Sequence, residues 1–447
     1  MKNTKLSKYW DTLQSSYWFF PGVILIAAIA LAFTMLHLDR TGKSGTTHLW
    51  WLYTGGPDGA RAVLSAIAGS MITVAGTAFS VTIVALQLAA SNFGPRLLRN
   101  FMQDVGNQVV LGTFIGTFIY CLLVLRTIRG ENYSPFVPQM AVTVGVALAI
   151  VSTGVLIYFI HHASTIIQAS QVIVNVSDDL DRAIDRLYPE RIGQHSQRQV
   201  GEIPNQFEQQ SAPVKALQKG YLQAIEDEEL MQLARQADVM LCLKTRPGKY
   251  VIPSTPLVLV YPHSNLSPKL VKQIQKAFIF GNERTEQQDI AFPIEQLVEI
   301  ALRAISPAVN DPFTAIRCID RLGAGLSRLA QRDFPSPYRY DDNHTLRIIA
   351  EPTTFEALTD RAFNQIRQYA RSDAAVTIRL LEAIALIATY AETSTQRGVL
   401  RRHAEMIQRG SQNALSEKCD LHDVEQRYQE AITALDSEEA NLDFRQL

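Results

Sequence analysis

The sequence predicts an α-helical membrane protein: four transmembrane helices, followed by a cytoplasmic α+β domain made of a small β unit and a helical bundle. Residues 18–160 contain eleven charged side chains among 143, whereas residues 161–447 contain seventy among 287. A bilayer core of about 30 Å requires about 20 mostly apolar helical residues. Four long runs without Asp, Glu, Lys or Arg meet this requirement: 12–38, 62–95, 105–125 and 132–177.

The predicted spans are 18–38, 63–88, 109–125 and 139–161, within a membrane domain over residues 1–162. The first span resembles a signal peptide, but it is long and lacks a convincing cleavage motif, so we interpret it as uncleaved. Four spans place both termini on one side of the membrane. The Lys and Arg counts near the two sides, six and five, are too even to orient the chain.

The cysteines give the orientation that loop charge does not. They are scattered along the chain without a CxxC pair or a disulfide-like framework, at Cys121, Cys242, Cys318 and Cys419. A reducing compartment suits three of these four cysteines better, so we expect both termini in the cytoplasm.

Small and polar side chains recur along the second span at steps of three, four or seven residues, which places them on one helical face. They are Ser65, Gly69, Thr73, Gly76, Thr77, Ser80, Gln87 and Ser91. Small residues permit close helix packing, which is one interpretation of this face. The other is a wet, uncharged pore lining formed when several copies surround an axis. The absence of acidic and basic residues from all four spans argues against a carboxylate-driven pump.

An apolar stripe with alternating steps of three and four follows the fourth span, from Ile166 to Leu187. It predicts a helical stalk over 163–188 that continues from the bilayer. The stripe packs either on neighbouring subunits or on its own domain. Tyr188-Pro189 ends the helix, because proline disfavours helical geometry in the residue before it.

The remaining chain is predicted in three parts. Residues 189–213 are polar and Gln-rich and predict a linker or insert. A small mixed α/β unit is expected over 214–265, with strands at 220–225, 239–244 and 250–261 and a helix at 227–236. An α-rich domain is expected over 266–447, with a strand at 345–350 and helices at 268–280, 292–305, 312–330, 353–369, 373–391, 396–407 and 422–435.

The sequence contains no convincing phosphate loop, dinucleotide fingerprint, HExxH, GxSxG, EF-hand loop or zinc-ligand spacing. We therefore expect no enzymatic activity, no cofactor and no metal. The formal charge of −1 excludes a broadly basic nucleic-acid binder, since phosphate contacts require clustered Lys and Arg.

Six polar residues form a candidate cluster between positions 284 and 311. They are Arg284, Asp289, Arg303, Ser306, Asn310 and Asp311. The two arginines can fork onto carboxylates or phosphate oxygens, and Asp311 before Pro312 has the form of a helix N-cap. The cluster is either a salt-bridge and capping network or a pocket for a ligand or effector.

The same region carries a family resemblance. The chain resembles a bacterial predicted-membrane-protein family catalogued as domain of unknown function 2254, most clearly in GNERTEQQDIAFPIEQLVEIALRAISPAVNDPFTAIRCIDRL at 281–322. The family's pattern is also similar to QLAASNFGPRLLRNF at 87–101, LGTFIGTFIYCLLVL at 111–125 and GKYVIPSTPLVLV at 248–260. This resemblance spans nearly the whole chain. It implies four spans, a cytoplasmic domain and no established activity.

Together these features predict a multi-pass protein of the bacterial inner membrane that forms a homo-oligomer and a passive ion-conducting pore, with a cytoplasmic gating or sensing domain. The alternative is a membrane-anchored sensor or scaffold that binds a ligand or protein partner through that domain. The expected partners are the lipid bilayer, further copies of the chain, and a small ion or anionic ligand, but no nucleic acid.

Overall fold

The computed structural model describes residues 18–41, 52–93, 104–129, 136–166, 168–188 and 203–437. The chain divides into two compact units, Met1–Gln171 and Val172–Leu447.

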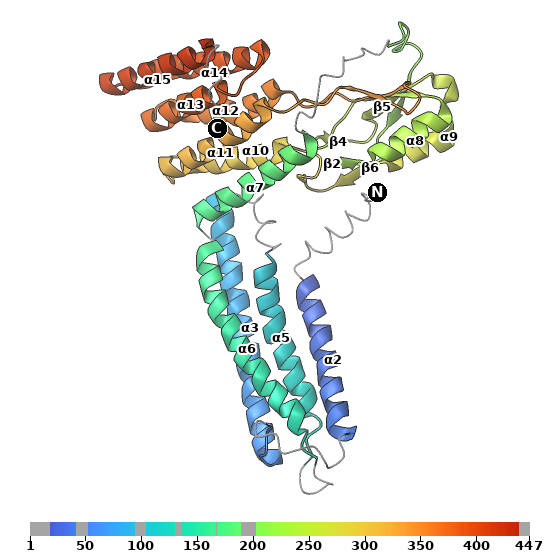
Figure 1. Cartoon of the computed structure of the whole chain (residues 1–447), viewed down its shortest axis with the longest axis vertical. Helices are drawn as coiled ribbons and strands as arrows, with labels where there is room; N and C mark the ends of the chain where they lie inside the picture. The colour runs from blue at the N-terminus through green and yellow to red at the C-terminus, as the bar shows by residue number, and fades with distance from the viewer. Residues whose placement is uncertain are drawn as a thin grey trace, which may run out of the picture. The chain divides into compact units, whose positions relative to one another are not determined.

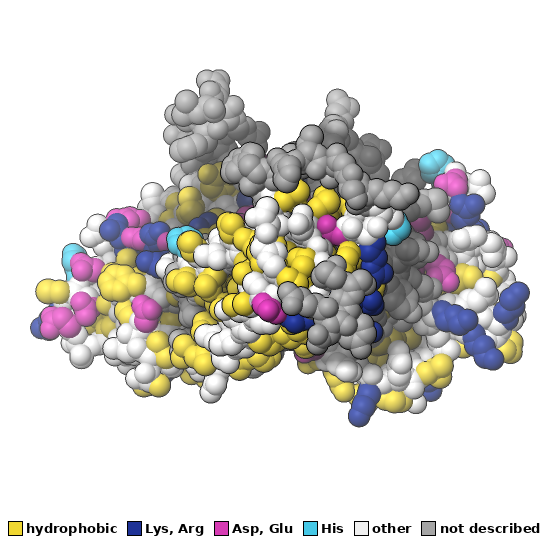
Figure 2. Space-filling view, turned by 90° about the horizontal axis from the view of Figure 1, so that it is seen from below, with side chains coloured by type: hydrophobic (Ala, Val, Ile, Leu, Met, Phe, Trp, Pro, Cys, Tyr) yellow, Lys and Arg dark blue, Asp and Glu magenta, His cyan; other side chains and the backbone are white. Residues whose placement is uncertain are grey.

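The first unit consists, in its described part, of four long helices that lie side by side (Figure 1). They are α2 (Phe19–Thr41), α3 (Pro57–Phe93), α5 (Val105–Leu125) and α6 (Gln139–Ile166). All four are long and apolar enough to cross a membrane. Hydrophobic side chains gather on the part of this unit visible in Figure 2. The four predicted spans are therefore confirmed as apolar helices, each of which runs a few residues further than predicted at one end or at both.

Helix α5 is the packing centre of this unit, because it contacts each of the other three helices. Its Phe114 and Tyr120 are fully buried, and the Tyr120 hydroxyl donates to the Ala141 carbonyl of α6 over 2.9 Å. A Cβ at Gly112 would lie 3.0 Å from the Pro21 Cα of α2. The small residue thus permits the close approach of α2 and α5, as a GxxxG pattern allows.

Helix α7 (Ala169–Leu187) carries the apolar stripe after the fourth span. The predicted continuous stalk is wrong in one respect: α6 ends at Ile166 and α7 begins at Ala169. Most of the stripe is buried within the second unit, where Leu180 meets Gly325 of α11 (Pro312–Ala330). The packing of α7 on its own domain buries the stripe, so α7 does not need to be one continuous helix with α6.

The second unit contains two small β-sheets. One has the strand order β1-β5-β3-β8-β7, in which only β3 and β8 pair in parallel; the other has the order β4-β2-β6. The strands are β1 (Ala212–Lys215), β2 (Gly220–Ile225), β3 (Met240–Leu243), β4 (Tyr250–Val251), β5 (Pro256–Tyr261), β6 (Phe278–Gly281), β7 (Tyr338–Tyr340) and β8 (Leu346–Ile349).

Two helices and one 3-10 turn accompany these strands: α8 (Asp227–Ala237), α9 (Pro268–Lys276) and η2 (His263–Asn265). Leu222, Leu241, Val258 and Ile274 are fully buried among them. The β unit draws strands from outside the predicted segment 214–265, because β6, β7 and β8 follow it in the sequence. Residues 189–202 of the predicted linker lie outside the described residues, and β1 begins inside its last part.

A helical bundle completes the second unit (Figure 1). With α11 it contains α10 (Ala291–Ala304), α12 (Phe355–Tyr369), α13 (Ala374–Ala388), α14 (Ser394–Gln412) and α15 (Lys418–Asp436). Several helices begin at side-chain caps: Asp311 for α11, Thr354 for α12, Asp373 for α13 and Thr393 for α14. The mixed helical and sheet architecture that was predicted after the four spans is confirmed.

Candidate functional sites

The small and polar face of α3 points outward from the helical unit. All six candidate residues are exposed: Ser65, Gly69, Thr73, Thr77, Ser80 and Gln87. The opposite face of the same helix is buried at Leu64, Ala68, Met71, Ala75 and Ala78. The face is therefore not packed between the described helices of the chain.

The hydroxyl groups of this face bond to their own helix. Thr73 donates to the Gly69 carbonyl over 2.8 Å, Thr77 to the Thr73 carbonyl over 3.0 Å, and Ser80 to the Gly76 carbonyl over 2.9 Å. Each hydroxyl proton is thereby used, and the hydroxyl oxygen keeps acceptor capacity. Apart from the adjacent residues and the backbone of α3 itself, no described atom lies within 4 Å of a Cβ built at Gly69 or Gly76. The face thus combines open space with outward hydrogen-bond acceptors.

Arg284 and Asp289 form a buried ion pair at the start of α10. Two guanidinium nitrogens of Arg284 lie 2.9 Å and 2.6 Å from Oδ2 of Asp289, and Arg284 also bonds Glu295. Glu295 in turn pairs with Arg361 of α12. Burial opposes the charge of Arg284, but Asp289 and Glu295 outweigh burial and raise its pKa. This network joins α10 to α12 and is fixed before any ligand arrives.

The other four candidates lie at the far end of α10, about 20 Å from its start at 1.5 Å per residue. Arg303 pairs with Glu299 over 3.5 Å, and Ser306 donates to the Arg303 carbonyl. Asn310 is exposed with φ of 51°, and Asp311 caps α11 through the Thr314 N–H over 3.1 Å. The six residues therefore do not meet in one site, because the helix between them separates the ion pair from the caps.

A cavity of about 820 Å³ opens beside the Arg284–Asp289 pair. Its walls come from the turn after β3, the N-terminal ends of α8 and α10, β7, the segment after β8, and α12. Six basic side chains line it against three acidic ones, Asp227, Asp289 and Glu351. The basic residues are Lys244, Arg246, Lys249, Arg284, Arg339 and Arg361.

Five of these six basic residues were missing from the sequence-based candidates. Arg246-Pro247-Gly248-Lys249 lies between the predicted strands 239–244 and 250–261. The basic residues on both sides of its Pro-Gly pair were the sequence signal that could have identified it. Arg339 lies on β7, a strand that was not predicted from the sequence. Such residues converge only when segments a hundred residues apart come together in the fold.

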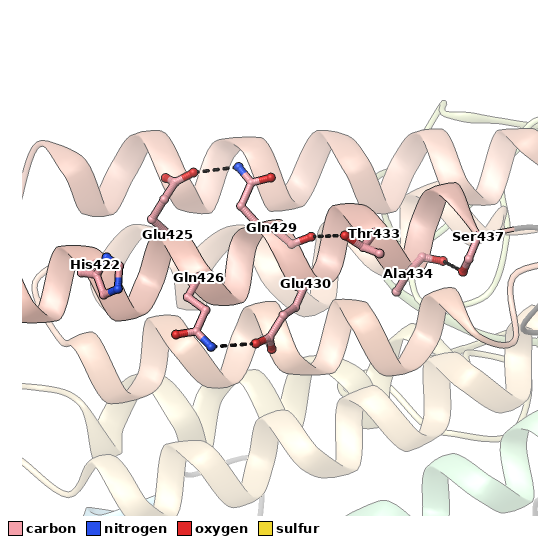
Figure 3. A pocket seen from close by; sticks show the side chains of 8 residues that line it. All are labelled: His422, Glu425, Gln426, Gln429, Glu430, Thr433, Ala434 and Ser437. Atoms are coloured by element: carbon pink, nitrogen blue, oxygen red, sulfur yellow. Dashed lines mark hydrogen bonds between the residues drawn. The ribbon is translucent and has the colours of Figure 1, made fainter.

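A second large depression lies on α15 and carries no comparable site. In Figure 3 its polar side chains lie along the helix and bond to one another, as in Gln429 to Glu425 over 2.8 Å and Gln426 to Glu430 over 3.1 Å. These bonds join neighbouring turns of one helix and do not converge on a ligand. Among the described residues, no three His, Cys, Asp or Glu side chains are grouped as a metal ion would require.

Comparisons with known proteins identify a family of predicted membrane proteins. The chain is 34% identical over 422 residues to uncharacterized proteins of Mycobacterium bovis and Mycobacterium tuberculosis, covering 92% of this chain and 79% of each relative. No solved structure matches it. The model of the family described as "Predicted membrane protein (DUF2254)" matches residues 14–386. The chain, an integral membrane protein by its four apolar helices, belongs to this family.

Proposed function

We propose that this protein assembles from several copies in the bacterial inner membrane and forms a passive ion-conducting pathway, with the second unit as a cytoplasmic gating or sensing domain. The outward small and polar face of α3 carries the proposal. Lipid tails offer no hydrogen-bond partner to a face of hydroxyl oxygens and Gln87. When several copies surround an axis, the same faces line a central pathway and contact the water in it.

The composition of the face supports a passive pathway. The predicted spans contain no Asp, Glu, Lys or Arg that a proton relay would use. Gly69 and Gly76 leave room for another helix or for a hydrated ion. The hydroxyl oxygens of Thr73 and Thr77 present acceptors, which favour cations over anions.

Three of the free cysteines, Cys242, Cys318 and Cys419, lie outside the spans and support the cytoplasmic placement of both termini that the proposal includes. The even number of spans places both ends of the helical unit on one side. The proposal contains no catalytic step.

Two measurements test the pathway. The mass of the detergent-solubilised protein distinguishes an oligomer from a monomer, and a monomer contradicts the pore. Ion flux through reconstituted protein is then compared for Thr73→Leu, Thr77→Leu and the control Phe79→Leu. Phe79 is exposed and lies two residues from Thr77, and therefore on another side of α3. We expect both threonine substitutions to reduce flux and the control to preserve it. Unchanged flux in both threonine variants excludes α3 as the lining.

A second candidate function, a membrane-anchored sensor, is favoured by the basic cavity of the second unit. A cavity of about 820 Å³ lies within the usual size range of small-molecule sites. In this role the four helices anchor the chain, and ligand occupancy of the cavity is the signal. A monomer without flux that still binds a ligand in the cavity supports this candidate over the pore.

A further inference from the structure

The basic cavity has a surplus of positive charge that its own carboxylates do not neutralise. Arg284 forms ion pairs with Asp289 and Glu295, and Arg361 forms an ion pair with Glu295. Arg339 interacts electrostatically with Asp227. Arg246 and Lys249 have no ion pair within the described chain. Among the described residues, the guanidinium of Arg246 has one hydrogen bond, which it donates to the neutral Thr353 hydroxyl over 3.3 Å. These two side chains supply the unused charge.

Arg246 and Lys249 belong to a turn that is fixed in place. The Gly248 N–H donates to the Leu222 carbonyl over 2.8 Å, and the Leu222 N–H donates to the Lys249 carbonyl over 2.9 Å. Asp289 packs directly against Gly248 and accepts a hydrogen bond from the Ala291 N–H over 3.2 Å. The turn is therefore anchored to β2 and α10, and its two cations are held at one wall of the cavity.

The rest of the cavity is not uniformly polar. Leu243, Val251 and Ala350 line it, with Pro335, Pro352 and Tyr188. The Tyr188 hydroxyl donates to the Thr353 carbonyl over 3.1 Å, and its ring meets the Phe334 ring edge-on at 4.9 Å. These contacts fix the ring, so the cavity offers a rigid apolar wall beside the cationic turn.

We infer that this cavity binds a small organic phosphate of nucleotide size, with its phosphate groups on Arg246 and Lys249 and its apolar part against the Tyr188 wall. Guanidinium and ammonium groups are the side chains that bind phosphate most strongly. An inorganic anion alone leaves most of the volume and the apolar wall unused. A neutral ligand leaves the two cations without partners.

The N-terminal ends of two helices add to the preference for an anion. Asp227 of α8 and Ala291 of α10 both line the cavity, and helix N-termini carry partial positive charge. Asp227 and Glu351 oppose an anion, but Arg339 and Lys244 on the same walls offset their charge. The inference is independent of the pore, since it concerns a cavity wholly within the second unit.

The test measures ligand binding to the full-length chain in detergent by calorimetry, without divalent cations. The probes are ATP, pyrophosphate and adenosine. The variant is Arg246→Gln with Lys249→Gln, and its control is Lys269→Gln with Lys272→Gln, two exposed lysines of α9 outside the cavity. Both double variants remove the same charge.

We expect ATP to bind most tightly, pyrophosphate more weakly, and adenosine not at all. The cavity variant should bind ATP at least about tenfold more weakly, as loss of charge-assisted hydrogen bonds predicts, and the control should match the wild type. Absence of ATP binding overturns the inference, as does equal binding to the cavity variant and the wild type. Equal affinity for pyrophosphate and ATP would show that the apolar wall does not contribute to binding. Equal affinity for adenosine and ATP would show that the phosphate groups do not contribute. Ion flux is recorded separately, so failure of this site and failure of the pore are distinguishable.

Discussion

Asp289 lies directly against Gly248: a Cβ built at Gly248 would be 2.1 Å from Oδ2 of Asp289. Gly248 also has φ of 86°, a conformation that L-residues with side chains rarely adopt. Two features therefore require glycine at this position: the positive φ of the backbone and the lack of space for a Cβ beside the Asp289 carboxylate. Through this contact the basic turn is coupled to the Arg284 ion pair.

Substitution Gly248→Ala tests this coupling. The new methyl group must displace Asp289 and accept a left-handed backbone, so we expect a loss of about 1 to 3 kcal/mol in the free energy of unfolding. Thermal unfolding of the detergent-solubilised chain measures the change. Gly398→Ala is the control, because Gly398 lies within α14 with nothing within 4 Å of its Cβ position. An alanine there is expected to be neutral or stabilising. Equal midpoints for the two variants would contradict the coupling.

The four spans were predictable because crossing a bilayer core requires a long apolar segment, which is a property of each segment alone. A long charge-free run is visible in the sequence without knowledge of its neighbours. The outward direction of Thr73 was not predictable from the sequence. It depends on α5 and α6, which pack on the other face of α3 and come from later segments of the chain. The sequence established the stripe but not which side of the unit it occupies.

The strand β6 illustrates why some elements were missed. Residues 268–280 were predicted as one helix, but that prediction is wrong after Lys276, where Phe278–Gly281 forms a strand. Its partner is β2, more than fifty residues earlier, and Leu222 lies opposite Phe280. Pairing with a distant strand overrode the local helical pattern. The basic cavity was missed for the same reason, since its arginines come from separate segments.

Helix α6 begins at a cap supplied by another helix. Asp39, near the end of α2, accepts the Met140 N–H over 3.0 Å and the Ala141 N–H over 2.9 Å. We expect Asp39→Ala to destabilise the helical unit by about 0.5 to 2 kcal/mol, the usual cost of losing an N-cap. Thermal unfolding in detergent checks this value. Asp58→Ala is the control, because its exposed carboxylate makes only a 3.5 Å surface pair with Arg61. A shift in Asp58→Ala as large as that in Asp39→Ala would refute the capping role.

The contact between α7 and α11 is tight at Leu180 and Gly325. Leu180 is 1% exposed, and a Cβ at Gly325 would lie 2.6 Å from its Cδ2. We expect Leu180→Ala to cost about 2 to 5 kcal/mol through loss of buried contacts, and Gly325→Ala to destabilise by overpacking. The combined variant should lose less than the sum, because the shortened side chain makes room for the methyl group. Leu217→Ala, at a 78% exposed position, is the control. Strict additivity in the double variant would show that the two residues do not share this space.

His403 predicts a pH dependence of the bundle. The imidazole is fully buried between α12 and α14, with Nε2 at 2.9 Å from the Asp360 carboxylate. Burial lowers its pKa from the ordinary 6.5, and although Asp360 opposes this shift, Arg402 and Arg367 add to it. Above pH 6.5 the ring is neutral in both the folded and the unfolded chain.

Below pH 6.5 the imidazole of the unfolded chain becomes protonated, whereas that of the folded chain stays neutral because its pKa is lower. The free energy of unfolding therefore decreases as pH falls from 6.5 toward the pKa of the folded chain. We expect the thermal midpoint to decrease over this window in the wild type and to decrease less in His403→Gln, whose amide bonds to Asp360 without titrating. Among the described residues, carboxylates other than Asp360 do not contact the substituted side chain, so the difference between the two curves reports the His403–Asp360 pair. Parallel curves would assign the pH dependence to those carboxylates instead. A midpoint that rises on acidification in the wild type would mean that Asp360 outweighs burial and raises the pKa of the imidazole.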